Sequence, residues 1–152
     1  MAENRQSYPE GIKWTKQRKD VFHVLNSATE PMSAAQIYTQ ILKNEPDVNY
    51  AVSTIYRILA AFEEQGFVEK TTFMGDDTVM YEWNKHEHTH YAVCLNCHKK
   101  VPVHVCPLEH FDHHDMMGRG PWAEIAKSDD FVVTAHKLEL YGYCKECEKN
   151  RK

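Results

Sequence analysis

The chain of 152 residues contains no apolar run close to the roughly 20 residues that a membrane-spanning helix requires. Residues 1–10 are polar and lack the apolar segment of a signal peptide. We therefore expect a cytoplasmic protein with no membrane partner. In that compartment, closely spaced cysteines are typical of metal or redox sites and not of a disulfide framework.

Glycine is also scarce, and the 6 glycines lie in turn contexts. The sequence has no glycine-rich phosphate loop, no H-E-x-x-H metalloprotease motif and no evident pair of nucleophile and base. These absences argue against several large enzyme classes. A zinc-dependent hydrolase that uses clustered histidines and a water molecule stays open as an alternative.

A basic excess is missing as well. The formal net charge is −4, and all of it comes from residues 1–84, because residues 85–152 are balanced. Since nucleic-acid-binding proteins usually carry a basic footprint, a DNA-binding hypothesis must rest on a local cluster, on helix termini and on dimerisation. The local cluster consists of Lys13, Lys16, Arg18 and Lys19.

The first half of the chain has helical periodicity in three places. Thr15 is a capping residue for a helix over residues 16–27, and Ser33 caps a second helix that ends before the turn at 44–47. A third helix is predicted over residues 51–65 and ends at Gly66. Its apolar stripe consists of Ala51, Ile55, Ile58, Leu59 and Phe62.

Two strand patterns follow, at residues 67–73 and 79–83, with Gly75-Asp76-Asp77 as the hairpin turn. Three short helices and a hairpin indicate a winged helix-turn-helix, although a small α+β core without a nucleic-acid role has the same pattern. Beyond a linker at residues 85–88, strands are predicted at 88–94, 99–106 and 131–143, with a helix from residue 107. The expected fold is therefore α+β, with a winged-helix DNA-binding domain over residues 1–84 and a small α/β dimerisation domain over residues 85–152.

Four of the 5 cysteines form two C-x-x-C pairs, Cys94-Leu95-Asn96-Cys97 and Cys144-Lys145-Glu146-Cys147. Each pair points its sulfurs into one tight turn, and two such turns supply the four thiolates of a closed tetrahedral Zn²⁺ shell. One pair alone would also fit a redox dithiol, whereas two pairs favour one structural zinc per chain. Because the unfolded chain cannot form this site in advance, metal binding would add directly to the free energy of folding.

The histidines need a separate explanation, since all 10 except His23 lie between Lys85 and His136. In an extended segment, alternate side chains share a face, which groups His86, His88 and His90. We predict that they belong to a second divalent metal site, for which Zn²⁺, Fe²⁺, Mn²⁺ and Ni²⁺ are all suitable. The candidate ligands are Glu82, His86, His88, His90, Glu109 and His136, with His104 and Cys106 as further candidates. For His136 the alternative is a hydrogen-bonded core histidine, and for Cys106 it is a small buried residue.

The third helix is the candidate DNA reader. Its polar faces carry Ser53, Thr54, Tyr56 and Arg57, which suit phosphate and base-edge contacts in a major groove. Each of these is also a common surface residue. The predicted DNA contacts are these four together with Lys13, Lys16 and Arg18.

In this order the motifs resemble the Fur (ferric uptake regulator) superfamily of bacterial metal-dependent repressors, from about Gly11 to Cys147. The residues that carry the resemblance are Thr15-Lys16-Gln17-Arg18, Ser33-Ala34 with Ile37-Tyr38, Val52-Ser53-Thr54-Ile55-Tyr56-Arg57, Cys94-Leu95-Asn96-Cys97 and the run from His136 to Cys144. The resemblance implies a winged helix, a dimerisation domain, a homodimer on a palindromic operator, a four-cysteine zinc and a regulatory metal site.

Residue by residue, Glu82, His88 and His90 resemble hinge-site ligands of the family, and His86, Glu109 and His136 resemble its second site. The sequence departs from the pattern at Pro31, where a ligand histidine is common, and at Pro102, where an acidic residue is usual. The histidine run also lies one residue further from Cys94 than is common. Either Glu30, His104 or Cys106 completes the hinge site, or the hinge site is weak.

We conclude from the sequence that the chain is a metal-responsive transcriptional repressor and not an enzyme. It is expected to bind double-stranded DNA as a homodimer and to sense Zn²⁺ or another divalent metal. A ferrous-iron or peroxide sensor of the same superfamily is the alternative. A metal-buffering module without a DNA target is an alternative from a different class.

Overall fold

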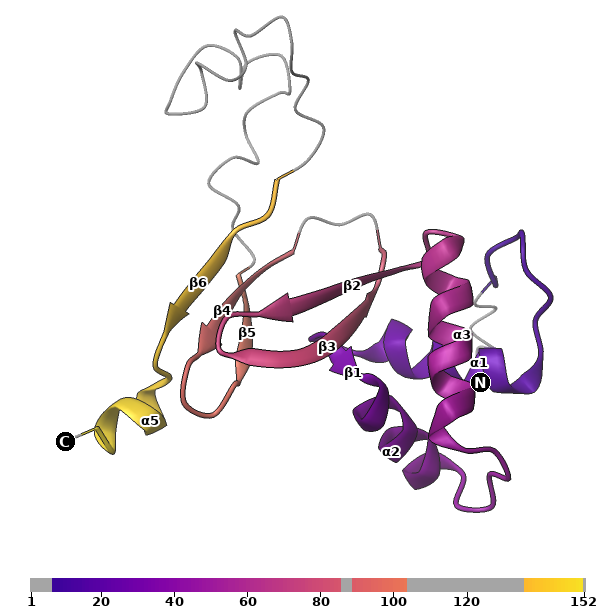
Figure 1. The fold of residues 1–152 in the computed structure, drawn as a ribbon, viewed down its shortest axis with the longest axis horizontal. Coiled ribbons are helices and arrows are strands. Elements are labelled where there is room, and N and C mark those ends of the chain that lie inside the picture. The colour runs from indigo at the N-terminus through magenta and orange to yellow at the C-terminus, as the bar shows by residue number, and fades with distance from the viewer. Residues whose placement is uncertain (1–6, 86–88, 104–135, 152) are drawn as a thin grey trace, which may run out of the picture. The chain divides into compact units, whose positions relative to one another are not determined.

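The computed structural model describes residues 7–85, 89–103 and 136–151 (Figure 1). The chain divides into two compact units, Met1–His86 and Glu87–Lys152, and each is described by itself. Helices and small sheets are both present, which confirms the predicted α+β class. None of the helices in the described ranges is long and apolar enough to cross a membrane.

Three helices begin the first unit: α1 (Lys16–Ser27), α2 (Ala34–Asn44) and α3 (Val52–Glu64). The Thr15 side chain accepts a hydrogen bond from the backbone N–H of Arg18, as the predicted cap requires. At α2, Ser33 and Gln36 form a reciprocal capping box, which satisfies two backbone donors at once. Gly66 follows α3 with a φ of 75°, a left-handed conformation that favours glycine.

The core of this unit is apolar and is built where the three helices meet the strands. Its largest fully buried side chains include Leu25, Ile37, Ile55, Leu59 and Phe62. The predicted stripe of α3 is confirmed except at Ala51, which is exposed because it is the N-cap residue and lies outside the helix.

A small antiparallel sheet completes the first unit, with strand order β1-β3-β2. Its strands are β1 (Met32–Ser33), β2 (Val68–Phe73) and β3 (Asp76–Trp83). The predicted turn at Gly75-Asp76-Asp77 is wrong by one position: Phe73 pairs with Asp76, so the turn is Met74-Gly75 and both aspartates belong to β3. Gly75 supplies the positive φ of 78° that so short a turn needs.

The described part of the second unit is a three-stranded sheet with order β5-β4-β6. The central strand β4 (His90–Cys94) pairs antiparallel with β5 (Lys100–Val103) and parallel with β6 (Glu139–Gly142). A short helix, α5 (Lys145–Lys149), follows β6 and was not predicted. The predicted strand at 131–143 is wrong over residues 136–138, which precede β6. The predicted helix from residue 107 and the strand residues 104–106 and 131–135 lie outside the described residues.

The buried stripe of α3 leads to a stability prediction. Leu59→Ala should lower the free energy of unfolding of the first unit by about 2–5 kcal/mol, because it leaves a cavity in a fully buried position. Urea unfolding followed by tryptophan fluorescence measures this, since Trp14 and Trp83 both contact the core. Met74→Ala, at a side chain that is 61% exposed, is the matched control and should change little. Equal effects of the two substitutions would contradict this account of the core.

Candidate functional site

The structure brings the four paired cysteines together. Cys94 ends β4, Cys97 closes the turn after it, Cys144 is the N-cap residue of α5, and Cys147 lies in the first turn of that helix. Their four sulfur atoms all lie within 4.8 Å of one another. Two segments about 50 residues apart in sequence therefore meet at one cluster.

The dimensions of the cluster suit a tetrahedral zinc shell. With zinc–sulfur bonds of about 2.3 Å, the sulfurs of such a shell are about 3.8 Å apart. The Cys97 and Cys144 sulfurs are separated by 3.8 Å. The donor set therefore fits a divalent metal that is bound by four thiolates, and the residues that would hold it are Cys94, Cys97, Cys144 and Cys147.

Hydrogen bonds to the sulfurs bias which thiol ionises. The backbone N–H of Cys144 donates to Cys94 Sγ (3.4 Å), and this bond, followed by one from Cys97, lowers the pKa of Cys94 to about 6. The Asn96 side-chain amide donates to Cys147 Sγ (3.3 Å), and this bond lowers the pKa of Cys147. The hydrogen bond with the Cys144 sulfur, burial and the other two sulfurs act in the opposite direction. Together they outweigh the Asn96 bond and raise the pKa of Cys147 to about 11. Four thiolates so close together repel one another, and a bound cation relieves that repulsion.

Helix α5 depends on this cluster. It has only five residues, and none of them is buried. Because isolated helices of this length are unstable in water, neither propensity nor apolar packing explains its formation. Its two cysteines, and the backbone bond from Leu95 N–H to the Gly142 carbonyl (2.8 Å) at the end of β6, connect it to β4.

Two histidines of the predicted second site lie side by side in the second unit. The rings of His90 and His136 have centroids 5.2 Å apart and are tilted by 30°. His90 is only 2% exposed, and its Nδ1 accepts a hydrogen bond from the backbone N–H of Leu138 (2.9 Å). Since an amide can only donate, Nδ1 must be the acceptor, and the neutral ring then carries its proton on Nε2.

The other predicted ligands are not brought together by the described residues. His86, His88, His104, Cys106 and Glu109 all lie outside those residues. Glu82 belongs to β3 of the first unit, where it lies opposite Glu69 of β2 in the antiparallel strand register. The resemblance grouped His90 with Glu82 and His88, whereas the structure places His90 beside His136.

Most of the predicted DNA contacts lie around one recess of about 420 Å³, between the start of α1 and the side of α3. It is lined by Lys13, Thr15, Gln17, Arg18, Thr54, Arg57 and Ile58. Ser53 and Tyr56 are exposed on α3, and the Tyr56 side chain is 54% exposed. In a unit that is acidic as a whole, three cations therefore gather at one place beside an exposed helix face.

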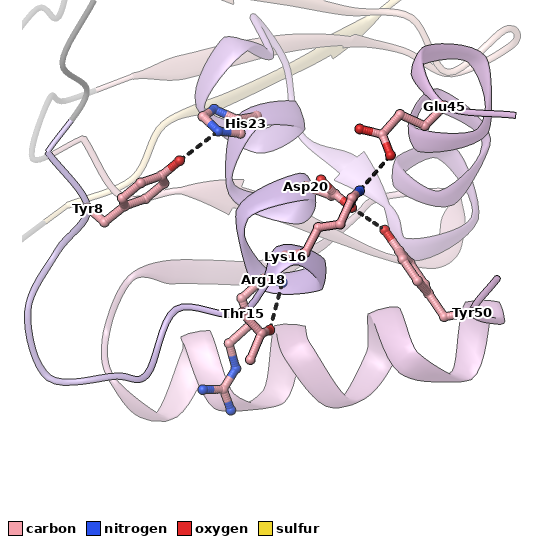
Figure 2. Close-up of polar contacts among 8 residues, drawn as sticks. All are labelled: Tyr8, Thr15, Lys16, Arg18, Asp20, His23, Glu45 and Tyr50. Carbon is pink, nitrogen blue, oxygen red and sulfur yellow. Dashed lines mark hydrogen bonds and ion pairs between the residues drawn. The ribbon is translucent and has the colours of Figure 1, made fainter. Parts of the chain in front are cut away.

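Lys16 has a different environment. Its ammonium group forms ion pairs with Asp20 (3.0 Å) and Glu45 (2.5 Å), and the carboxylates, Glu45 first, raise its pKa (Figure 2). The hydroxyl of Tyr50 donates to the same Asp20 carboxylate (2.8 Å), and burial followed by this bond raises the pKa of Tyr50. Lys16 thus joins the start of α1 to α2 and to the residues before α3, and its charge is already partly neutralised.

The N-terminus of α3 offers backbone donors. Its N-cap residue, Ala51, has no side chain that could accept a hydrogen bond from the first turn. The first N–H groups of an uncapped helix, and the positive end of its dipole, favour a nearby anion. This is consistent with a DNA phosphate near Ser53 and Thr54.

Sequence reasoning missed the roles of Asn96, Leu138 and Tyr50. Asn96 stands inside a C-x-x-C turn, where an amide donor to sulfur is a reasonable expectation. By contrast, the Leu138–His90 and Tyr50–Asp20 bonds join residues 48 and 30 positions apart, and no local pattern indicates them.

Comparison with known proteins places these features in context. Residues 9–141 match the model of the ferric uptake regulator family. A peroxide-responsive repressor, PerR, of Staphylococcus epidermidis is 32% identical over 140 residues, which cover 91% of this chain and 83% of the relative. A ferric uptake regulation protein of Campylobacter jejuni is 30% identical over 141 residues, covering 93% and 83%.

Solved structures of ferric uptake regulators have a fold similar to that of this chain. The Helicobacter pylori ferric uptake regulator, whose structure is described as revealing three functional metal binding sites, has a TM-score of 0.67 and 25% identity, covering 90% of this chain and 83% of that one. The Vibrio cholerae ferric uptake regulator has a TM-score of 0.66 and 26% identity, covering 88% and 92%.

The cysteine cluster leads to a prediction on metal removal. Cys147→Ser should lose the tightly held metal and unfold α5, because that helix buries nothing else. Native mass spectrometry measures metal per chain, and hydrogen exchange over residues 138–149 measures the loss of structure. Cys106→Ser leaves all four clustered cysteines in place; it is the control and should keep the tightly held metal of the cluster, whatever its effect on a second metal. Full metal content and unchanged exchange in Cys147→Ser would refute the four-thiolate assignment.

Proposed function

Because the chain belongs to the ferric uptake regulator family of metal-responsive transcriptional repressors, we propose that it binds a palindromic DNA operator as a homodimer. Binding would require a second divalent metal in addition to a structural zinc. Zn²⁺ is the first candidate for this second metal. Family members are transcriptional regulators, so the zinc-dependent hydrolase is set aside. We take residues 1–84 as the DNA-binding domain and residues 85–152 as the metal-binding dimerisation domain. Such a protein would work in the cytoplasm, where its DNA lies.

The observation that carries the DNA-binding proposal is the basic recess. Lys13, Arg18 and Arg57 line it, and the ion pairs found among the described residues involve other cations. Their charges are therefore available to backbone phosphates, which supply much of the affinity of protein–DNA complexes. Tyr56 and Ser53, exposed on α3, are then suited to base-edge contacts in the major groove.

Two metals would have separate roles. The four clustered cysteines would hold zinc for stability, since no residue of α5 is buried against the described part of the chain. For the second metal, His90 and His136 would be two ligands from the described residues of the second unit. His86, His88, Glu109, His104 and Cys106 remain predicted partners outside the described residues. Glu82 lies in the other unit, and its role as a ligand stays a prediction. Imidazole and carboxylate ligands bind Zn²⁺, Fe²⁺, Mn²⁺ and Ni²⁺.

Metal binding and DNA binding should be coupled. If the second metal strengthens DNA binding by some factor, DNA must strengthen metal binding by the same factor. A dimeric reader also sets its two recognition helices about 34 Å apart, or a multiple of that, so its half-sites should be spaced by about one DNA turn.

Peroxide sensing is a second candidate because the 32% identical Staphylococcus epidermidis relative is a peroxide-responsive repressor. In this case the second metal would be Fe²⁺, and peroxide would oxidise a ligand histidine. The gain of one oxygen atom on His90 or His136 after peroxide treatment of the iron-loaded protein, but not of the zinc-loaded protein, would favour it.

The proposal is tested by removing the labile metal before DNA binding. Protein treated with a mild chelator should keep one metal per chain and lose its affinity for duplexes selected from a random pool. The selected sequences should contain inverted half-sites, and each divalent metal can then be titrated back to find which restores binding at the lowest free concentration. If chelation leaves DNA binding unchanged, the chain represses without sensing metal. If no duplex is selected, the metal-buffering alternative holds.

Substitution of His136 separates the two metal sites. His136→Ala should keep the four-cysteine metal, lose the second metal and lose metal-dependent DNA binding, because it removes one imidazole of the described pair. His23→Ala, at an exposed histidine of the other unit, is the control for metal content and should keep both metals. Retention of the second metal by His136→Ala would exclude His136 from the site.

A further inference from the structure

We propose that Tyr8 and Trp14 are positioning residues for DNA binding: they anchor residues 8–15, here called the N-terminal strap, so that Lys13 and Arg18 form a clamp for one backbone phosphate of DNA in the basic recess. This inference rests on the proposed function, because it concerns how the basic recess is held in place for DNA binding. Neither aromatic residue lines the recess. Both therefore act through Lys13 and Arg18.

Trp14 fastens the strap at its C-terminal end. Its ring lies 5.5 Å from that of Phe22, 5.6 Å from that of Phe62 and 6.4 Å from that of Phe67, centroid to centroid, with the Phe67 ring nearly parallel to it. Its Nε1–H donates to the Pro9 carbonyl (2.8 Å), which closes the strap into a loop. A packed aromatic ring and one hydrogen bond thus fix the residue directly after Lys13.

Tyr8 fastens the other end of the strap. Its ring lies 4.9 Å from that of Trp14 and 5.3 Å from that of Phe22. Its hydroxyl is 3.0 Å from Nε2 of His23 on α1, as Figure 2 shows. The ammonium of Lys19 lies 5.2 Å from the centre of the same ring, a cation–π contact that adds to the attachment.

Between these two anchors the strap turns at Gly11. The glycine has a φ of 101°, and a Cβ at this position would lie 3.2 Å from Oε1 of Gln65 at the end of α3. The left-handed backbone favours glycine, and the contact places the strap beside the exposed side chain of Gln65. The strap therefore crosses the end of α3 along a restricted path, and the position of Lys13 follows from that path.

Lys13 and Arg18 are joined by a main-chain bond. Nη1 of Arg18 donates to the Lys13 carbonyl (2.6 Å), while the Arg18 backbone N–H donates to Thr15 Oγ1. The guanidinium is thus bound to the strap through Nη1, and its other N–H groups can donate to a phosphate. Because the Lys13 side chain is exposed, it can approach the same ligand.

A DNA phosphate suits this recess better than a neutral ligand. The lining combines three cations with the hydroxyls of Thr15 and Thr54, and a phosphate oxygen accepts hydrogen bonds from both kinds of donor. The neighbouring exposed face of α3 makes a phosphate of the bound duplex the natural source. A free phosphate ion is the other source, and the experiment separates the two.

The test compares variants of the full-length, metal-loaded protein in binding to a mixed-sequence duplex of about 30 base pairs, long enough for two half-sites. Trp14→Phe keeps an aromatic ring and removes the Pro9 bond, and Lys13→Ala removes the cation. Trp83→Phe makes the same chemical change in the same aromatic cluster, at a residue outside the strap, and is the matched control. Each dissociation constant is measured over a range of salt concentrations, with and without inorganic phosphate.

Trp14→Phe should weaken binding about three- to tenfold. The slope of the logarithm of the binding constant against the logarithm of the salt concentration should become shallower by up to about 0.9 per protomer, as expected when one phosphate contact is lost. In the Lys13→Ala background Trp14→Phe should have little further effect, because both substitutions remove the same contact. Trp83→Phe should leave the salt dependence unchanged. Competition by millimolar inorganic phosphate would show that the free ion also occupies the recess.

A second measurement does not depend on DNA. Trypsin should cleave after Lys13 faster in Trp14→Phe than in Trp83→Phe or the unchanged protein, because the strap is less firmly held. Additive effects of Trp14→Phe and Lys13→Ala on DNA binding, or equal cleavage rates, would overturn the positioning role. By contrast, failure of the unchanged protein to bind any duplex, together with faster cleavage of Trp14→Phe, would refute the DNA-binding function and leave the anchor intact.

Discussion

The second unit depends on one constraint, the convergence of four sulfurs from two distant segments. The described sheet of this unit buries few apolar side chains, and α5 buries none. Mutual repulsion of the thiolates would separate the segments, whereas a shared cation holds them together. A metal bound here would therefore add stability to a part of the chain in which the described residues bury few apolar side chains. It would also fix the parallel pairing of β4 with β6, because Cys94 and Cys144 lie at or just beyond the ends of those two strands.

The first unit is stabilised in a different way, and this frees its surface for binding. Helices α1–α3 and the small sheet share an apolar core, and the burial of its side chains stabilises the unit. Its acidic residues are partly used in internal contacts, as in the pairs of Lys16 with Asp20 and Glu45. The cations of the recess are left for an external anion. A net charge of −4 is thus compatible with DNA binding, because the local arrangement of charge decides the interaction.

Local sequence signals predicted most of the first unit and part of the second. Thr15, Ser33 and Gly66 mark helix ends by rules that act within one turn, and the two C-x-x-C spacings predicted that four sulfurs would meet. The two-residue strand β1, the one-position error in the hairpin turn and helix α5 could not be predicted in the same way. Strand β1 exists because Met32 and Ser33 pair with Tyr81 and Met80, almost 50 residues later, and α5 forms because the cluster holds its first turn. Contacts that are distant in sequence leave no local periodicity.

The His90 hydrogen bond would oppose the binding of a second metal at this histidine. A neutral imidazole has one lone pair for a ligand, and in His90 this lone pair at Nδ1 already accepts the Leu138 N–H. Coordination through His90 therefore requires either loss of that bond or replacement of the Nε2 proton, and both oppose binding. The four cysteines differ in one respect: a thiolate sulfur that accepts a hydrogen bond keeps further lone pairs for a metal, so Cys94 and Cys147 need not lose the bonds from Cys144 and Asn96. The raised pKa of Cys147 means that its thiol must still lose a proton, and cation binding offsets that cost by relieving the repulsion among the sulfurs. A second metal at His90 would then bind more weakly than the first and would disturb the backbone immediately before β6, the strand that leads to Cys144. Occupancy of a labile site and the arrangement of the metal-stabilised sheet would in this way be linked through a single hydrogen bond.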